Sequence, residues 1–431
     1  MLARSPSVLA TLLAIVGAVG GCATLLAVRG QQERADRNAV ISGTITTAYE
    51  AQGPLVVGLA TREPSGFVIV DYFVAEKPGP WIFAVGPGTY WLGAFEDANR
   101  DTRYDDEPAL RPDPDRPVTL AAGRELHGIA LHIPREGRLA RGRFSLRDVQ
   151  ATRSPGEQQR VSAFALSVAG DVTTLDDPRF DRAVATKGMW QHYDFLLEGR
   201  PGIYFLEPYD PKKIPVLFVH GIGGTPQEFR ALVDGLDRTR FQPWVFYYGS
   251  GARLEAIATL LMQLFVRLRT TYGVERAAVV AHSMGGLVSR EFILRDHETN
   301  GTEVIRTFVT VSSPLGGMAS AADGVERSPV VLRSWYGLAP DGAYLNGLFF
   351  KDGAKMARRR LPEHIAYHLL FGFHGGGPDG SGDGVVAVAS QLRPEAQEEA
   401  RSERGFDEDH TSILRSPAVA ARVNAILAEL R

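Results

Sequence analysis

The chain contains a single cysteine, Cys22, among its 431 residues. No disulfide can therefore form within the chain, and a metal site built from cysteine thiolates is excluded. Charge of one sign is also scarce, because 47 lysines and arginines are balanced by 50 aspartates and glutamates, for a net charge of −3. Proteins that bind nucleic-acid phosphates carry a basic excess, which this sequence lacks. The sequence has no dinucleotide fingerprint, Walker loop or zinc motif, so we expect neither a cofactor nor a nucleic-acid partner.

The composition is that of a folded chain with more than one domain. Hydrophobic residues make up 44% and charged residues 23% of the sequence, close to the average of globular proteins. This excludes global disorder, collagen-like repeats and a polytopic membrane protein. At about 150 residues per domain, the chain is long enough for two or three structural units.

The first 28 residues are predicted to lie outside the fold. Arg4 is followed by an uncharged run, 5–28, which is apolar or small over most of its length. In one interpretation, 8–19 is the core of a secretory signal, and the sequence VGGC ending at Cys22 resembles a bacterial lipobox, whose cysteine becomes the lipidated first residue. In the other, 8–28 is an uncleaved helix that spans ~31 Å at ~1.5 Å per residue, enough to cross a bilayer.

Both interpretations tether the rest of the chain to a membrane, outside the cytoplasm. The position of Cys22 directly after two glycines favours the lipobox, whereas the apolar stretch 23–28 favours the helix. In either case the charged and amide-rich stretch 29–38 is expected to be a solvated tether.

Residues 39–134 predict a small all-β sandwich. Short apolar or alternating runs recur there with Gly and Pro turns between them. The pattern resembles the transthyretin-like or carboxypeptidase-regulatory-like accessory domains of secreted proteins. The runs are 40–45, 55–60, 66–74, 81–85, 90–95 and 128–133.

One loop of this region carries oxygen ligands at alternating positions. Asp97, Asn99 and Asp101 have the spacing of a calcium loop. An EF-hand would need glycine where Thr102 stands, and its glutamate comes one place early, at Glu107. We therefore favour an acidic surface turn and keep a calcium site as the alternative.

Residues 161–431 predict an α/β domain, which follows a linker at 135–160. Apolar strands alternate with helical stretches, a pattern typical of a mostly parallel sheet covered on both faces. The two short apolar runs 195–197 and 203–206 are interpreted as a strand pair that opens this domain.

The segment 281–285, AHSMG, predicts a nucleophile at a strand-to-helix turn. An exposed nucleophile above a sheet needs a sharp turn, which admits only small residues two places before and after it. Ala281 and Gly285 fill these places around Ser283. The segment follows an apolar strand, 277–281, and precedes a helical stretch, as this turn requires.

Residues from about 212 to 430 resemble the α/β hydrolases of the lipase and esterase kind, in the branch of bacterial lipases and GPI inositol-deacylase-like proteins. Five motifs carry the resemblance, in the order of that family and over about half of the chain. They are HGIGG at 220–224, AHSMGG at 281–286, SSPLGG at 312–317, GDGVV at 382–386 and DHTSIL at 409–414.

The resemblance implies a catalytic triad of Ser283, Asp383 and His410, in the chain order of this fold. Asp383 matches the family's Asp-Gly-Val-Val pattern, and His410 precedes an apparent terminal helix. His374 is the rival base and Asp379 the rival acid. The backbone N–H groups of Ile222 and Met284 would form the oxyanion hole.

These residues predict a membrane-tethered serine hydrolase that cleaves small-molecule esters or lipids. The apolar stretch 323–356 would form a cap or lid over the site. An acyltransferase, thioesterase or amidase with the same triad is an alternative, because only the acyl acceptor or leaving group differs. A binding protein that works through its β domain is the other alternative.

Overall fold

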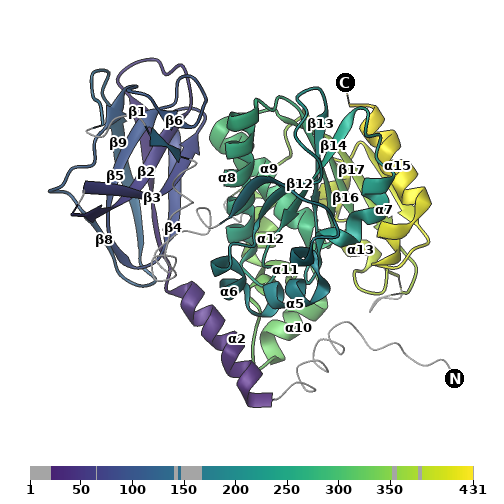
Figure 1. Ribbon diagram of the computed structural model, residues 1–431. Helices are drawn as coiled ribbons and strands as arrows, with labels where there is room; N and C mark the ends of the chain where they lie inside the picture. The colour runs from purple at the N-terminus through teal and green to yellow at the C-terminus, as the bar shows by residue number, and fades with distance from the viewer. Residues whose placement is uncertain are drawn as a thin grey trace.

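The computed structural model describes residues 21–64, 66–139, 144–146, 167–351, 357–376 and 381–430, and the side chains from residue 26 onward. An all-β domain and an α/β domain lie side by side, and the helix α2 (Gly21–Asp36) extends below them (Figure 1). The predicted cleavage and anchor segments before residue 21 lie outside the described residues. Within these residues, no helix is long and apolar enough to span a membrane.

Two packed sheets form the β domain. One sheet has the strand order β4-β1-β9, with β1 and β9 parallel, and the other has the order β3-β2-β5-β7, with β8 paired to β5. Their inner faces bury residues such as Ile41, Val57 and Phe83. The strands are β1 (Ala39–Thr47), β2 (Leu55–Glu63), β3 (Gly66–Ala75), β4 (Gly79–Val85), β5 (Gly88–Glu96), β7 (Ala109–Leu110), β8 (Val118–Leu120) and β9 (Glu125–Ile133).

A short strand pair closes one end of this domain. The strand β10 (Phe144–Ser145) pairs with β6 (Arg103–Tyr104), and the ring of Phe144 stacks on that of Tyr104. These residues fall within the stretch 135–160, which was expected to be a linker. The described part of that stretch therefore contributes to the packing of the β domain.

An eight-stranded sheet forms the centre of the α/β domain. Its order is β11-β12-β14-β13-β15-β16-β17-β18, and all neighbours are parallel except β12 and β14. The strands are β11 (Val168–Val172), β12 (Gly202–Phe205), β13 (Ile214–Val219), β14 (Phe241–Tyr247), β15 (Ala277–His282), β16 (Ile305–Val311), β17 (Ala366–Gly372) and β18 (Ser402–Phe406).

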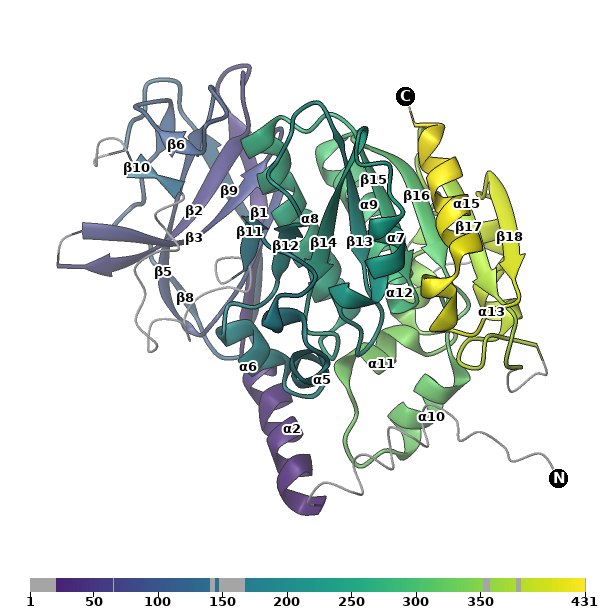
Figure 2. The same ribbon diagram turned by 45° about the vertical axis from the view of Figure 1, so that its right-hand side comes forward.

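Helices cover both faces of this sheet, because its central strands are apolar on both sides (Figure 2). Leu217 and Val219 of β13 pack with the long helices of one face, α8 and α9, whereas Val216 and Phe218 pack with α7 and α15 on the other. This arrangement and the preceding β domain confirm the predicted fold class. The helices are α5 (Arg182–Trp190), α6 (His192–Leu197), α7 (Arg230–Asp234), α8 (Leu254–Tyr272), α9 (Met284–Asn300), α10 (Ala319–Arg327), α11 (Arg333–Leu338), α12 (Ala343–Gly347), α13 (Val388–Gln391), α14 (Pro394–Gln397) and α15 (Pro417–Ala428).

The strand pair that was expected at 195–197 and 203–206 is wrong in its first member. Residues 192–197 form the helix α6, and β12 pairs with β11 and β14 instead. A run of three apolar residues fits a buried helix turn as well as a strand. Phe195 packs its ring edge-on against Tyr247 of β14, and this tertiary contact accounts for the apolar run.

The stretch 29–38, expected to be a solvated tether, is helical up to Asp36 and packs on the α/β domain. The buried amide of Gln31 donates to the Asp194 carboxylate at 2.6 Å and accepts from the Asp194 backbone N–H at 3.0 Å. Arg34 forms an ion pair with the same carboxylate at 2.8 Å. These contacts fix α2 on α6.

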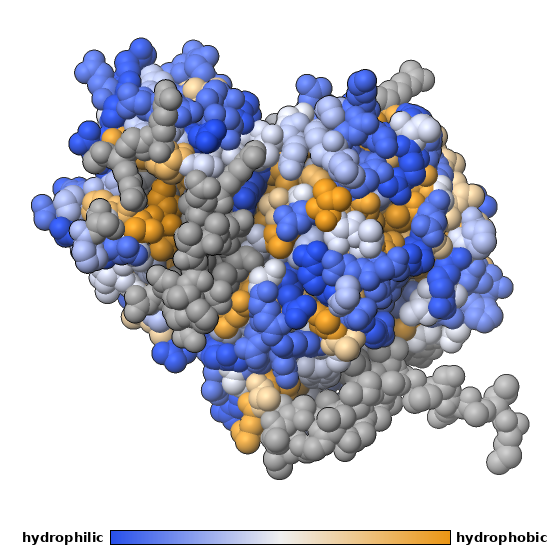
Figure 3. Space-filling view, in the orientation of Figure 1, coloured by the Kyte–Doolittle hydropathy of each residue, from blue (hydrophilic) through white to orange (hydrophobic). Residues whose placement is uncertain are grey.

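The two domains share a buried ion cluster centred on Arg269 of α8. Its guanidinium lies 3.2 Å from the carboxylate of Glu76, in the β domain, and 3.1 Å from that of Asp296 on α9. All three side chains are largely buried. Hydrophilic residues cover much of the face of the molecule drawn in Figure 3, and apolar residues gather there in separate patches.

We expect Arg269→Met to lower the free energy of unfolding by about 3 kcal/mol, because two buried carboxylates lose their cation. Arg327→Met is the control, since this arginine is 75% exposed and pairs with Asp323 at only 3.5 Å. A surface pair of this kind contributes less than ~1 kcal/mol. Urea denaturation at pH 7 measures both effects, and equally small losses in the two variants would contradict the role of the cluster.

Candidate active site

Ser283 occupies a sharp turn between β15 and α9. Its backbone has φ 54° and ψ −131°, a conformation that is rare outside glycine. A Cβ atom at Gly285 would lie 2.4 Å from the carbonyl oxygen of Val219 and 2.5 Å from that of His220. The turn therefore lies against the end of β13 with no room for a side chain at this position.

The loop after β13 also approaches the serine closely. A Cβ atom at Gly221 would lie 2.7 Å from the Cβ of Ser283 and 3.1 Å from its Oγ. Only glycine allows this approach without displacement of the serine. The HGIGG segment is thereby placed directly beside the Ser283 hydroxyl.

The structure brings Ser283, Asp383 and His410 together in one chain of hydrogen bonds. His410 Nε2 lies 3.0 Å from Ser283 Oγ, and His410 Nδ1 lies 2.8 Å from Asp383 Oδ2. The three residues follow β15, β17 and β18, whose carboxyl ends lie at the same edge of the parallel sheet. All three are buried.

Asp383 is held as a carboxylate. Burial opposes its ionisation, but the hydrogen bond and positive charge that His410 offers, together with the N–H groups of Val385 and Val386, lower its pKa below the usual value. Those two N–H groups donate to Oδ1 at 3.0 and 2.7 Å, so Oδ2 is left for His410. The carboxylate therefore orients the imidazole with Nε2 toward the serine.

Two further histidines support this site as neutral groups. His282 Nε2 donates to the carbonyl oxygen of His410 at 2.8 Å and so holds the backbone of that loop. His220 stacks on Tyr248 with its ring centroid 4.2 Å away. Burial is the main cause that lowers the pKa of His282 to about 3 and that of His220 to about 4. Both rings are therefore uncharged at neutral pH.

The predicted oxyanion donors flank the serine. Met284 is the first residue of α9, where N–H groups have no partner within the helix, and Ile222 lies in the loop that contacts Ser283. Neither N–H donates a hydrogen bond to another group of the described residues. Both donors are thus available to a developing negative charge.

The rival and auxiliary candidates lie elsewhere. His374 pairs with Asp407 at 2.8 Å, and both side chains are exposed. Asp379 lies outside the described residues.

The loop proposed as a calcium alternative is bonded within itself. The Asp97 carboxylate accepts N–H bonds from Asp101 and Thr102, while Asn99 donates to Asp101 at 3.1 Å. No group of three or more His, Cys, Asp or Glu suited to a metal ion occurs in the described ranges.

Three helices, α10, α11 and α12, occupy the stretch expected as a cap, and the first begins at Ala319, before the predicted start at 323. Arg290 of α9 fixes the end of this stretch, because its buried guanidinium donates to the carbonyl oxygens of Leu348 and Arg359 and pairs with Glu399. Residues 352–356 lie outside the described residues. The cap is thus attached to the helix that starts at Ser283.

Ser250 is a residue that the sequence analysis did not single out. It follows β14 in a Gly-Ser-Gly segment and accepts a hydrogen bond from the N–H of Gly223, at 2.9 Å. The only sequence signal is this glycine-flanked serine at the carboxyl end of a buried strand.

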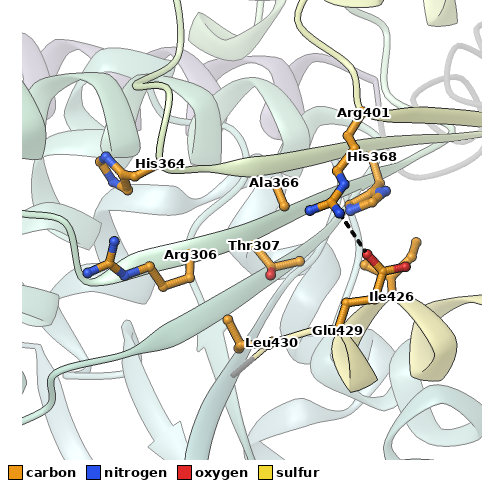
Figure 4. Close-up of a pocket in the computed structure, with 9 residues that line it drawn as sticks. All are labelled: Arg306, Thr307, His364, Ala366, His368, Arg401, Ile426, Glu429 and Leu430. Carbon is orange, nitrogen blue, oxygen red and sulfur yellow. Dashed lines mark ion pairs between the residues drawn. The ribbon is translucent and has the colours of Figure 1, made fainter.

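A pocket of about 320 Å³ lies at the opposite edge of the sheet (Figure 4). It is formed around the starts of β16 and β17, far along these strands from the ends that carry the triad. Its guanidinium groups are compensated, since Arg401 pairs with Glu429 at 3.5 Å and Arg306 with Glu303 at 3.0 Å. This pocket is not part of the site around Ser283.

Comparison with known proteins agrees with the fold. Residues 214–341 match the family model described as "alpha/beta hydrolase fold". No curated protein sequence matches the chain. Similar solved structures include the mature lipase BlEst2 of Bacillus licheniformis, with 17% identity, 52% of this chain and 97% of that chain covered, and a TM-score of 0.43. Lipase B of Aspergillus fumigatus has 14% identity, with 52% and 55% covered and a TM-score of 0.39.

A metagenomic carboxyl esterase, MGS0156, has 15% identity to this chain, with 51% of this chain and 77% of that chain covered and a TM-score of 0.38. The sheet order, the strand-to-helix turn at Ser283 and the family match define the class of the second domain. It is an alpha/beta hydrolase domain, as the resemblance in its motifs predicts.

We expect Gly285→Ala to destabilise the protein by about 2 kcal/mol or more, because the new methyl group forces the serine turn away from β13. Gly347→Ala is the control, since a Cβ atom there would meet nothing within 4 Å. Its free energy of unfolding should stay equal or rise by up to ~1 kcal/mol. Chemical denaturation measures the difference, and a neutral Gly285→Ala would show that the turn is not tightly packed.

Acid should destabilise the protein in the window between pH 6.5 and about 4. His282 and His220 have ordinary pKa values of 6.5 when unfolded and about 3 and 4 when folded. The unfolded chain therefore binds protons first as the pH falls, and stability present above pH 6.5 is lost. His282 is faced by His410, Asp383 and His220.

His282→Gln removes one of these titrations and keeps a donor for the His410 carbonyl. We expect the unfolding free energy of this variant to fall less steeply with acid, by up to ~1.4 kcal/mol per pH unit. His127→Gln, at an exposed site of the β domain, should keep the wild-type slope. Identical slopes for all three proteins, from urea titrations at several pH values, would contradict this assignment.

Proposed function

We propose that the protein is a serine hydrolase that cleaves carboxylic esters through an acyl-enzyme on Ser283. The observation that carries the proposal is the unbroken set of hydrogen bonds from Ser283 through His410 to Asp383. Nucleophilic catalysis needs a base within hydrogen-bond reach of the nucleophile and a third group that orients the base. The distances of 3.0 and 2.8 Å meet both requirements.

The first half-reaction forms the acyl-enzyme. Ser283 Oγ attacks the ester carbonyl carbon while His410 Nε2 takes the hydroxyl proton. The carbonyl electron pair moves onto its oxygen, which receives the N–H groups of Ile222 and Met284. His410 then donates its proton to the alkoxide oxygen of the leaving alcohol, and the carbon–oxygen bond of the ester breaks. Asp383 stabilises the imidazolium that forms between these steps.

The second half-reaction repeats these roles with water. His410 takes a proton from the water molecule as its oxygen attacks the acyl carbon, and the same two N–H groups receive the oxyanion. The proton then returns to Ser283 Oγ as the carboxylic acid leaves. Because the triad is buried and Asp383 remains ionised, the imidazole keeps one orientation through both halves.

We further propose that the substrate is lipophilic and that the protein acts outside the cytoplasm, tethered to a membrane through its first 28 residues. Apolar side chains of the cap, such as Val330, Trp335 and Tyr336, support an acyl-binding role for α10 and α11. The intact mass of protein extracted from membranes distinguishes a chain cleaved before Cys22 and lipidated there from an uncleaved anchor.

Hydrolysis of p-nitrophenyl esters from acetate to palmitate tests the activity. We expect turnover by the wild type and a loss of at least ~10⁴-fold in kcat for Ser283→Ala, because the nucleophile is gone. Ser289→Ala, two turns along on the same helix, should keep full activity. Turnover that persists in Ser283→Ala, or a folded wild type that cleaves no ester of the series, would contradict the proposal.

A further inference from the structure

One hydroxyl group outside the HGIGG loop orients that loop. The N–H of Gly223 donates to Ser250 Oγ at 2.9 Å, and Ser250 is only 1% exposed. The peptide unit that carries this N–H joins Ile222 to Gly223. Fixing it also limits rotation of the preceding peptide unit, which carries the Ile222 N–H.

The loop needs such a restraint because its backbone is unusual. Gly223 has φ 62°, in the left-handed region, and the N–H of Gly224 turns back to the carbonyl oxygen of Gly221 at 3.1 Å. Glycine is flexible, so this tight turn does not by itself define the direction of the Ile222 N–H. A buried acceptor at a fixed position supplies that definition.

The segment that carries Ser250 is itself held from two sides. On one side, a Cβ atom at Gly251 would lie 1.8 Å from the carbonyl oxygen of Met189 in α5, and one at Gly249 would lie 3.1 Å from the Cβ of His192 in α6. On the other side, the N–H of Ser334 in α11 donates to the Gly251 carbonyl at 3.3 Å. Ser250 therefore has little freedom to move away from Gly223.

We propose that Ser250 is a positioning residue for the oxyanion hole: through its bond to Gly223 it holds the Ile222 N–H toward the oxygen on which negative charge develops. The inference rests on the proposed function, because it assigns a role within that reaction. Ser250 touches no reacting atom and acts only through the loop. Preorganised donors of this kind account for a large share of catalysis in acyl transfer.

The first test compares two serine-to-alanine variants of the full chain. Ser250→Ala removes the acceptor, and we expect kcat to fall ~10–100-fold with KM within about threefold, because a misplaced donor loses most of its transition-state stabilisation. Ser289→Ala is the matched control, since its hydroxyl is fully buried and has no hydrogen-bond partner among the described residues. Its kcat should equal that of the wild type. An unchanged kcat in Ser250→Ala would overturn the inference.

The second test separates positioning from a general structural effect. An alkyl trifluoromethyl ketone forms a hemiketal with Ser283: the Oγ–carbon bond forms, the carbonyl electrons move to oxygen, and the serine proton goes to His410. The corresponding carbinol binds without this oxyanion. We expect Ser250→Ala to weaken inhibition by the ketone ~10–100-fold and by the carbinol less than about twofold. Equal weakening of both inhibitors, or of neither, would overturn the role.

Failure of the proposed function remains distinguishable. A wild type that neither cleaves esters nor is inhibited by the ketone would refute the reaction itself, whereas an active wild type with an equally active Ser250→Ala would refute only the role of Ser250. Should Ser250→Ala not fold, Ser250→Cys replaces it. Its thiol has nearly the same shape but is a weak acceptor, so kcat should again fall while the carbinol still binds.

Discussion

The site depends on the contact between the Ser283 turn and the end of β13. Gly285 lies against the carbonyl oxygens of Val219 and His220, and Gly221 lies against the serine itself. This packing explains how a strained backbone conformation persists at Ser283, because the surrounding structure leaves it no alternative. The same contact presents the hydroxyl above the sheet and brings the HGIGG loop to its side.

Parallel strands supply the rest of the geometry. Because β15, β17 and β18 end at one edge of the sheet, residues 127 positions apart in the sequence, Ser283 and His410, meet within 3.0 Å. The loops at this edge are then restrained by groups behind them. His282 holds the His410 backbone, Ser250 holds the HGIGG loop, and α6, which packs behind Ser250, is fixed in turn by Gln31 of α2. The helix nearest the proposed membrane tether is thus continuous with the support of the site.

Much of this could be predicted from the sequence because the signals are local. The serine turn needs small residues at fixed offsets, and buried parallel strands are continuous apolar runs, so β13, β15 and β16 and the residues at their ends could be predicted. The helix α6 could not, because its three apolar residues fit either element until Tyr247 is placed beside Phe195. The packing of α2 depends on Gln31 meeting Asp194, 163 residues away, and polar residues in such a pattern also fit a solvated tether. Ser250 was missed for the same reason, since its importance arises only from its contact with Gly223.

The most direct test of the account is the intact mass of the purified full chain after incubation with an alkyl fluorophosphonate. This reagent is attacked only by an activated nucleophile, and its fluoride leaves as the oxygen–phosphorus bond forms. The account predicts one adduct per chain, located by peptide mapping on Ser283. A folded protein that remains unmodified, or that carries its adduct on another residue, would contradict it.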